Sequence, residues 1–333
     1  MARPFVRRIL LDVYRYAPWV AMGLQLSGGG AVVGTISNTG LTASTGRAGI
    51  YVQVDTTTIS TISNGSSVNS TATISGPNAF LLNASTISTV NNYGILKSTT
   101  NDTSIQMGGT GKIITLNNYS TGNISGGING ISVGGGSGGG SIDSINNYGN
   151  ITGTSNTGIT TRGGQIATIN NFSTGTISGN IGLYRSQGSI NVINNYGKIQ
   201  GITSGVLVEY YSPDVINSVV NSGVIAASSG GGLFTHGHIT TLTNTGLIYG
   251  SCTGIVFSLG APSSNRITTL NNLQGPGSAI PSGLTIPFST GTFTNNAIIY
   301  RGALPTNYNI IIKSPAQYGS LIYQYRVLIC AES

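Results

Sequence analysis

Carboxylates are the first residues to consider for chemistry, because hydrolysis of a glycosidic bond commonly uses two of them a few ångströms apart. The chain of 333 residues has only seven Asp and Glu. Glu209 and Asp214 lie close in sequence and flank Tyr210 and Tyr211. The acids are also too sparse to build the multi-carboxylate Ca²⁺ site that polysaccharide lyases usually need. We therefore expect no catalytic residues and no cofactor.

Histidines and cysteines are the other candidate metal ligands. His236 and His238 occupy alternate positions, which share one face of a strand and could hold a metal ion. No cysteine or acid lies nearby in sequence to complete the coordination. Cys252 and Cys330 are too far apart to define a disulfide framework or a metal site. We expect no metal site, and a polar turn before Ile239.

The formal net charge of +7 would suit a nucleic-acid partner. Charged residues make up only 6% of the chain, however, and those of the central region occur singly. Without a basic stripe no surface would follow a phosphate backbone, so we expect no nucleic-acid partner. No run of 18 or more apolar residues occurs, and we expect no transmembrane segment.

These residues are set within one degenerate repeat, which dominates the sequence. Each copy reads aliphatic, any residue, Thr or Ser, aliphatic, a mostly polar residue, and Asn. The ten copies begin 23 to 29 residues apart, at Val33, Ile59, Ile87, Ile113, Ile142, Ile166, Ile190, Ile216, Ile239 and Ile267. Thr292–Asn295 resembles a worn eleventh copy.

Three columns of the aligned copies are polar or aromatic. The sixth position is Asn in every copy: Asn38, Asn64, Asn92, Asn118, Asn147, Asn171, Asn195, Asn221, Asn244 and Asn272. The third is Thr or Ser in nine copies: Thr35, Thr61, Thr89, Thr115, Ser144, Thr168, Ser218, Thr241 and Thr269. The seventh is aromatic in five consecutive copies: Tyr93, Tyr119, Tyr148, Phe172 and Tyr196. The acids form no such column, since Asp143 is the only acid at its position.

The remainder of each copy contains short stretches that begin with Gly and are typical of strands, such as 246–249 and 254–257. Each copy therefore predicts about three strands of 3–5 residues, separated by turns of Gly, Asn and Ser. One coil cannot bury its aliphatic residues alone, whereas coils stacked about 4.8 Å apart enclose a continuous interior. The sequence predicts an all-β fold: a single-stranded parallel β-helix, or three-sided solenoid, of about ten to eleven rungs over residues 31–295.

Equal positions of successive coils lie above one another in such a stack. The Asn column becomes a ladder in which each amide donates to a carbonyl of the next rung. Asn also tolerates the left-handed backbone that a sharp corner needs. The aromatic column becomes a second ladder just past that corner. Its rings either offer a stacking platform for sugars or only pack from rung to rung.

The two ends of the chain depart from the repeat. Residues 1–30 predict either of two structures. One is an amphipathic helix that caps the solenoid, because four apolar residues share a helical stripe: Phe5, Ile9, Val13 and Tyr16. The other is a secretory signal, because a basic start precedes an apolar run at 16–26. In residues 296–333 we expect two strands, at 308–313 and 318–323, to terminate the rod.

The pattern Ile-x-x-Ile-Asn-Asn-Tyr-Gly, followed by an Ile-x-Gly strand, occurs at residues 142–153 and 190–201. It resembles the passenger regions of bacterial autotransporter-type adhesins, and residues 308–321 look like the segment that ends such passengers. The resemblance covers about residues 33–321 and implies an adhesive β-helix at the cell surface. Members of that family generally carry a C-terminal outer-membrane β-barrel. The sequence up to Ser333 shows no alternating barrel strands. We therefore expect a passenger without its translocator, or another kind of rod such as a virion fibre.

These observations predict a non-enzymatic extracellular rod, structural or adhesive, that binds surfaces, glycans or copies of itself through loops and outward ladders. One alternative is a carbohydrate-active β-helix enzyme, a polysaccharide lyase or hydrolase, in which Glu209 and Asp214 would be the acids to test. Another is an ice-binding protein, in which the Thr/Ser column would be the flat hydroxyl array. Such arrays usually have two hydroxyl files on a face, and only one can be aligned here.

Overall fold

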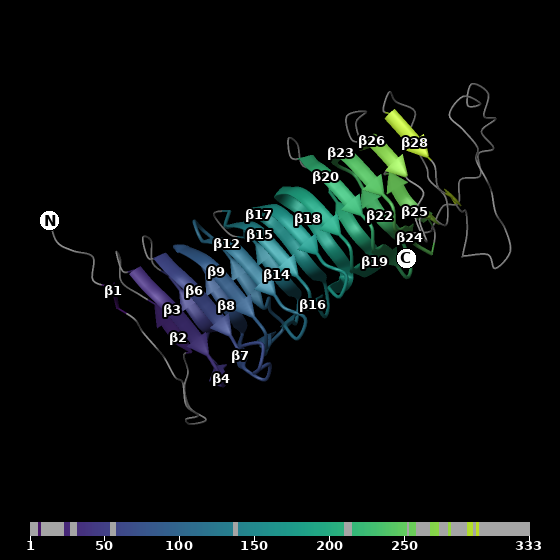
Figure 1. The fold of residues 1–333 in the computed structure, drawn as a ribbon. Helices are drawn as coiled ribbons and strands as arrows, with labels where there is room; N and C mark the ends of the chain where they lie inside the picture. Colours follow the sequence, from purple (N-terminus) through teal and green to yellow (C-terminus); the bar gives the residue numbers. More distant parts are fainter. Residues whose placement is uncertain are drawn as a thin grey trace, which may run out of the picture.

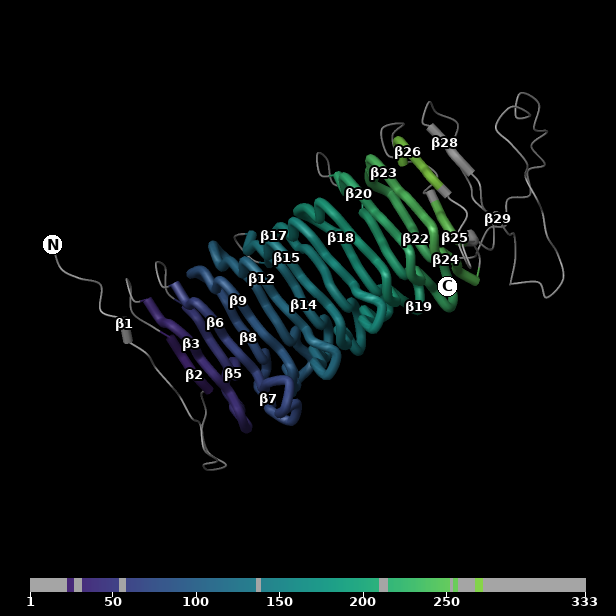
Figure 2. The backbone as a smooth tube through the Cα atoms, viewed as in Figure 1, coloured from purple at the N-terminus to yellow at the C-terminus, as the bar shows by residue number. Residues whose placement is uncertain are grey.

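The computed structural model describes residues 6–7, 23–26, 32–53, 58–135, 139–209, 215–251, 253–257, 267–272, 279–280, 292–295 and 298–299. These residues form a solenoid of short parallel strands and contain no helix (Figure 1). Figure 2 shows the coils side by side along the rod, from the purple N-terminal turns to the green ones. The predicted all-β parallel β-helix is therefore confirmed. Nowhere in these ranges is there a helix that could cross a membrane.

The first side of the solenoid carries the repeat motif. Its strands are β3 (Val32–Asn38), β6 (Thr58–Asn64), β9 (Thr86–Asn92), β12 (Lys112–Asn118), β15 (Ser141–Asn147), the ends of β17 (Thr157–Asn171) and β18 (Thr176–Asn195), β20 (Val215–Asn221), β23 (His238–Asn244), β26 (Ile267–Asn272) and β28 (Thr292–Asn295). Strand β1 (Val6–Arg7) pairs with β3 on this side. The strand β28 confirms the eleventh copy, because its Phe293 and Asn295 pair in register with Leu270 and Asn272.

The second and third sides follow in each turn. The second side holds β4 (Leu41–Ala43), β7 (Thr73–Gly76), β10 (Ile95–Ser98), β13 (Asn123–Gly126), β16 (Asn150–Gly153), the starts of β18 and β19 (Lys198–Val208), β21 (Val224–Ala227), β24 (Leu247–Tyr249), β27 (Ala279–Ile280) and β29 (Ile298–Ile299). The third side holds β2 (Leu24–Leu26), β5 (Ala48–Val52), β8 (Asn78–Leu82), β11 (Ile105–Met107), β14 (Asn129–Val133), parts of β17, β18 and β19, β22 (Gly231–Thr235) and β25 (Thr253–Phe257). The solenoid is thus three-sided.

The strands of successive turns pair in parallel with equal positions opposite each other. Asn118 of β12, for example, pairs with Asn92 of β9 in the preceding turn and with Asn147 of β15 in the next. Eight consecutive turns, from β3 to β22, are described on all three sides, and β23–β25 continues the stack. The sequence predicts ten to eleven rungs, slightly more than the number of turns described on all three sides. Beyond residue 257 only separate strands are described.

Aliphatic columns from all three sides fill the interior. The fourth position of the repeat is buried in every copy, from Ile36 at 4% exposure to Leu270 at 4%, with Leu116 and Ile145 fully enclosed. Each fully buried Ile or Leu contributes about 1.5–3 kcal/mol relative to an exposed side chain. A coil has such partners only in its neighbours, so the turns stabilise one another cooperatively.

Two local features shape the turn. On the first side, Ile113 and Leu116 both point inward with Ile114 and Thr115 between them, and the pairing passes over Ile114. This local departure from alternation leaves two successive side chains, Ile114 and Thr115, outside the core, and it recurs in each turn. On the third side, glycines allow close approach of successive backbones. A Cβ added to Gly158 would lie 2.5 Å from the carbonyl oxygen of Gly182.

The N-terminal segment adds strands to the first complete turn. Val6–Arg7 pairs with Val32 and Val33, and Leu24–Leu26 pairs with residues 50–52. The capping helix predicted across Val6 is therefore not found at these two residues, because the open edge of β3 binds their backbone groups instead. Phe5, Ile9, Val13 and Tyr16 and the terminating strands predicted at 308–313 and 318–323 lie outside the described residues.

Candidate functional site: a face of amide, hydroxyl and aromatic ladders

The Asn column forms a continuous inner amide ladder at the first corner. Each Nδ2 donates to the Oδ1 of the Asn in the next turn, through eight consecutive bonds of 2.7–2.8 Å that join Asn38, Asn64, Asn92, Asn118, Asn147, Asn171, Asn195, Asn221 and Asn244. These side chains are at most 4% exposed. The predicted ladder is confirmed, and the side chain of Asn272 lies outside the described residues.

The inner amide ladder also holds the corner itself. The second N–H of Asn118 donates to the backbone carbonyl of Asn150 (3.1 Å), the first residue of the second side in the next turn. Asn64 and Asn195 make the equivalent bond at 3.0 Å. The left-handed backbone expected at the corner is not used, because Ser85 is the one non-glycine residue of the described part with a positive φ. Asn is required here for its two donors and its acceptor.

A second, outer amide ladder lies one position earlier on the outward face. It joins Asn91, Asn117, Asn146, Asn170 and Asn194 through four bonds of 2.9 Å. Its direction is opposite, since each Nδ2 donates to the preceding turn. The sequence analysis missed this ladder by treating the fifth position as mostly polar, although five consecutive copies have Asn there. These side chains are half-buried and reach the surface.

The five aromatic residues stack as predicted just past the corner. Ring centres are 4.0 Å apart for Tyr93–Tyr119 and Tyr148–Phe172, and 6.4 Å apart for Tyr119–Tyr148 and Phe172–Tyr196. The inner three rings therefore turn both faces toward neighbouring rings and offer a ligand only their edges. Rung-to-rung packing explains their arrangement. Sugar stacking stays a prediction for the outer faces of Tyr93 and Tyr196, the latter 46% exposed.

The aromatic ladder is linked to the outer amide ladder. The hydroxyl of Tyr119 donates to Asn91 Oδ1 at 3.4 Å. A hydrogen bond with Tyr93, partial burial and the neighbouring phenols of Tyr93 and Tyr148 raise the pKa of Tyr119 to about 12. The Tyr119 phenol therefore stays neutral over the whole physiological range.

The Thr/Ser column stands beside the outer amide ladder. Thr89, Thr115, Ser144 and Thr168 pair in register on successive strands, and their side chains are half-buried. We call the combined surface of this hydroxyl file, the outer amide ladder and the aromatic ladder the ladder face. It repeats uncharged donors and acceptors at every turn from β9 to β18.

The acids and histidines fall in separate places. Asp143 pairs with Lys112 at 2.9 Å, with both side chains about 40% exposed. Glu209 accepts a hydrogen bond from Ser186 Oγ at 3.4 Å. Asp214, Tyr210 and Tyr211 lie outside the described residues, as do Cys252 and Cys330.

The two histidines contact different residues. The ring of His236 packs 4.7 Å from Phe234, whereas His238 Nε2 is 2.8 Å from Thr268 Oγ1. The described ranges contain no group of three or more His, Cys, Asp or Glu that could hold a metal ion.

Among the described residues, one charged side chain is in the interior. Arg185 is fully buried on the third side, in a column where Thr161 precedes it and Val208 follows. Its Nε donates to the carbonyl of Gly188 (3.0 Å) and its Nη1 to that of Glu209 (2.7 Å). These bonds offset part of the cost of burying the charge. In the sequence Arg185 is one of the single charges of the central region, and no pattern there indicates its burial.

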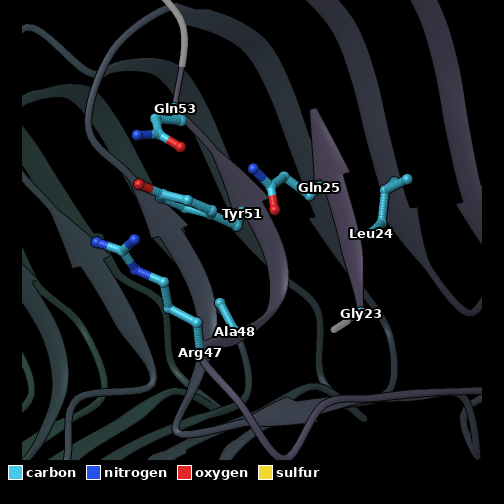
Figure 3. A pocket seen from close by; sticks show the side chains of 7 residues that line it. All are labelled: Gly23, Leu24, Gln25, Arg47, Ala48, Tyr51 and Gln53. Carbon is cyan, nitrogen blue, oxygen red and sulfur yellow. The ribbon is translucent and has the colours of Figure 1, made fainter. Parts of the chain in front are cut away.

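A shallow pocket of about 130 Å³ opens between β2 and β5, near the N-terminal end of the rod (Figure 3). Polar side chains around it include Gln25, Arg47, Tyr51 and Gln53. The Arg47 guanidinium carbon lies 4.4 Å from the centre of the Tyr51 ring. No sequence motif marks these residues.

Comparisons with protein-family models, with curated proteins and with solved structures each gave no match to the chain.

Proposed function

We propose that the protein is a non-enzymatic structural and adhesive rod, located outside the cell or on its surface, that binds neutral glycans or glycan-coated surfaces through its ladder face. The observation that carries this proposal is the unbroken axial register of the ladders. The outer amide ladder repeats over five consecutive turns, and the hydroxyl file runs in step with it over the first four, up to Thr168, with Val192 at that position in the fifth. Such a face suits a partner that is itself a repeating polymer.

The interior of the rod supports a mechanical role. The inner amide ladder joins nine turns through bonds of 2.7–2.8 Å, all of them shielded from water. Bonds of this kind cannot be exchanged for bonds to water when the rod is bent, so bending leaves buried polar groups unpaired. A stiff rod holds its binding face in a fixed line over several turns.

The chemistry of the ladder face supports a hydroxyl-rich, uncharged partner. Amides and hydroxyls each offer a donor and an acceptor to sugar hydroxyls. The nearby charges, Lys112 and Asp143, cancel as an ion pair. The ladder face therefore offers little charge of its own to a ligand, and contact over many turns must supply the affinity through multivalency.

The resemblance of residues 142–153 and 190–201 to autotransporter-type passengers supports the extracellular location and the adhesive role. In passengers of that type the β-helix presents binding surfaces beyond the outer membrane. The shared feature is the repeat pattern, which specifies a rod that exposes its sides.

Adhesion of beads under flow tests the proposal. Beads coated with the full chain pass over cellulose, chitin and bare glass, and we expect retention on at least one of the two glycans. Asn146→Arg places a long charged side chain in the outer amide ladder and should reduce retention severalfold. Asn150→Arg is the matched control, because Asn150 is exposed on the second side of the same turn. Thermal melting by circular dichroism verifies that both variants fold.

Two results would overturn the proposal. Equal retention of Asn146→Arg and Asn150→Arg would show that the ladder face is not the adhesive surface. Release of reducing ends from pectin, alginate or chitin would show an enzyme, above all if Glu209→Gln or Asp214→Asn abolished it.

A further inference from the structure

The pocket between β2 and β5 joins residues that are distant in sequence. Strand β2 pairs in parallel with β5, and Gln25 lies directly opposite Tyr51. Gln53 follows Tyr51 by two residues, which places both on one face of the chain. Arg47 precedes β5 and reaches the same place. Figure 3 shows these four side chains around one depression on the outside of the solenoid.

The guanidinium of Arg47 lies against the Tyr51 ring, and no carboxylate of the described residues pairs with it. It stacks on the Tyr51 ring at 4.4 Å, and Tyr51 is only 4% exposed, so the ring is a fixed support. A stacked guanidinium keeps its N–H groups in plane at its edges, where they match the two oxygens of a carboxylate. In the part of the chain that the structure describes, the Arg47 side chain makes no ion pair and no hydrogen bond.

Neutral polar groups surround this cation. The amides of Gln25 and Gln53 each offer donors and an acceptor at the rim of the pocket. Asn83 Nδ2 donates to the Tyr51 hydroxyl at 3.5 Å, so the hydrogen of that hydroxyl remains to be donated. A single cation among amides and a phenol suits a ligand with one negative charge and several hydroxyls.

We propose that this pocket binds the carboxylate of an acidic saccharide, such as one uronic acid residue of a polysaccharide. Arg47 pairs with the carboxylate, and Gln25 and Gln53 bond the hydroxyls next to it. A volume of about 130 Å³ is enough for the polar edge of one sugar ring. The choice of a saccharide rests on the proposed adhesive function, whereas the choice of a carboxylate rests on Arg47 alone.

The pocket and the ladder face are separate surfaces. The pocket lies on the third side beside β2 and β5, whereas the ladder face lies on the first side from β9 to β18. Binding at each can therefore be measured and removed independently.

Isothermal titration of the full chain with trigalacturonate tests the proposal. We expect binding that weakens in 0.5 M NaCl, because a partly exposed ion pair is screened by salt. Arg47→Gln should weaken binding about tenfold or more, since a charge-assisted pair is lost. Gln25→Ala, a second variant in case Arg47→Gln misfolds, should weaken it severalfold. Arg162→Gln is the matched control, because Arg162 is an exposed arginine elsewhere on the rod. It should bind within twofold of the parent.

Three further probes identify the ligand class. The methyl ester of trigalacturonate has the same shape without the charge and should bind at least tenfold more weakly. Inorganic sulfate or N-acetyl-aspartate amide binding as tightly as trigalacturonate would overturn the saccharide and show a general anion or peptide site. Absence of trigalacturonate binding, or equal binding by Arg47→Gln, would overturn the pocket proposal. Bead retention that is sensitive to Asn146→Arg would still stand in that case, so the two proposals fail separately.

Discussion

Removal of one amide from the inner ladder should destabilise the rod far more than its size suggests. In Asn118→Ala two buried side-chain groups lose their partners, the Nδ2 donor of Asn92 and the Oδ1 acceptor of Asn147, both 2.8 Å from Asn118, and the backbone carbonyls of Gly122 and Asn150 each lose one donor. A buried group left unsatisfied costs about 1–3 kcal/mol, so the variant should lose about 2–6 kcal/mol of unfolding free energy. Asn150→Ala, on the exposed surface of the next turn, should change it by no more than about 0.5 kcal/mol.

Urea titration followed by circular dichroism measures this difference. Because stacked turns can unfold in groups, native-state hydrogen exchange should be measured as well. The backbone N–H groups of Tyr119 and Tyr148 donate to the carbonyls of Asn92 and Asn118, at 2.9 and 2.7 Å, and report on the affected corner. Both should lose protection in Asn118→Ala. Equal stability of Asn118→Ala and Asn150→Ala would refute the view that the ladder holds the turns together.

Two further predictions concern the aromatic ladder and the third side. The pKa of Tyr119 in the folded protein is about 12, above the ordinary value of about 10. The neutral phenol therefore stabilises the fold below pH 10. This contribution to the unfolding free energy is lost as the pH rises from 10 toward 12. Tyr119→Phe should reduce the loss of unfolding free energy between pH 9 and pH 11.5, and a loss of the same size in both proteins would contradict the assignment. Gly158→Ala brings a Cβ to 2.5 Å from the Gly182 carbonyl and should cost about 1–3 kcal/mol in urea titration. Gly34→Ala, with nothing within 4 Å, should be neutral or slightly stabilising, and equal effects at both glycines would contradict the packing argument.

The repeat columns made the solenoid predictable from sequence. Equal positions of successive turns have equivalent surroundings, so the side chain at the sixth position has the same role in every turn. An amide ladder is the simplest explanation for Asn at that position in all ten copies. The outer amide ladder was equally visible at Asn117 and Asn146 but spans fewer copies. Its recognition as a surface depends on the outward face of the strands and on the departure from alternation at Ile114.

The pocket and the N-terminal strands depend on contacts that no column reveals. Gln25 precedes the first repeat, and only the pairing of β2 with β5 brings it to Tyr51. The apolar stripe at residues 5–16 favours a helix when local spacing alone is considered. Val6–Arg7 instead pairs with the free edge of β3. This contact is between residues distant in sequence, so the spacing of apolar residues cannot predict it. The burial of Arg185 is likewise not indicated by any column, because it donates to the backbone carbonyls of Gly188 and Glu209, which a sequence pattern does not reveal.

The one-way direction of the inner amide ladder has a consequence for how such a molecule can change its length. Each Asn receives one hydrogen bond from the turn before and gives one to the turn after, while Thr42 Oγ1 donates to the first acceptor, Asn38 Oδ1 (3.1 Å). If one whole coil were duplicated or deleted, the Asn side chains on either side of the change would therefore still form a donor–acceptor pair, and the ladder would stay continuous. Length can vary in steps of about 4.8 Å while the two ends stay unchanged.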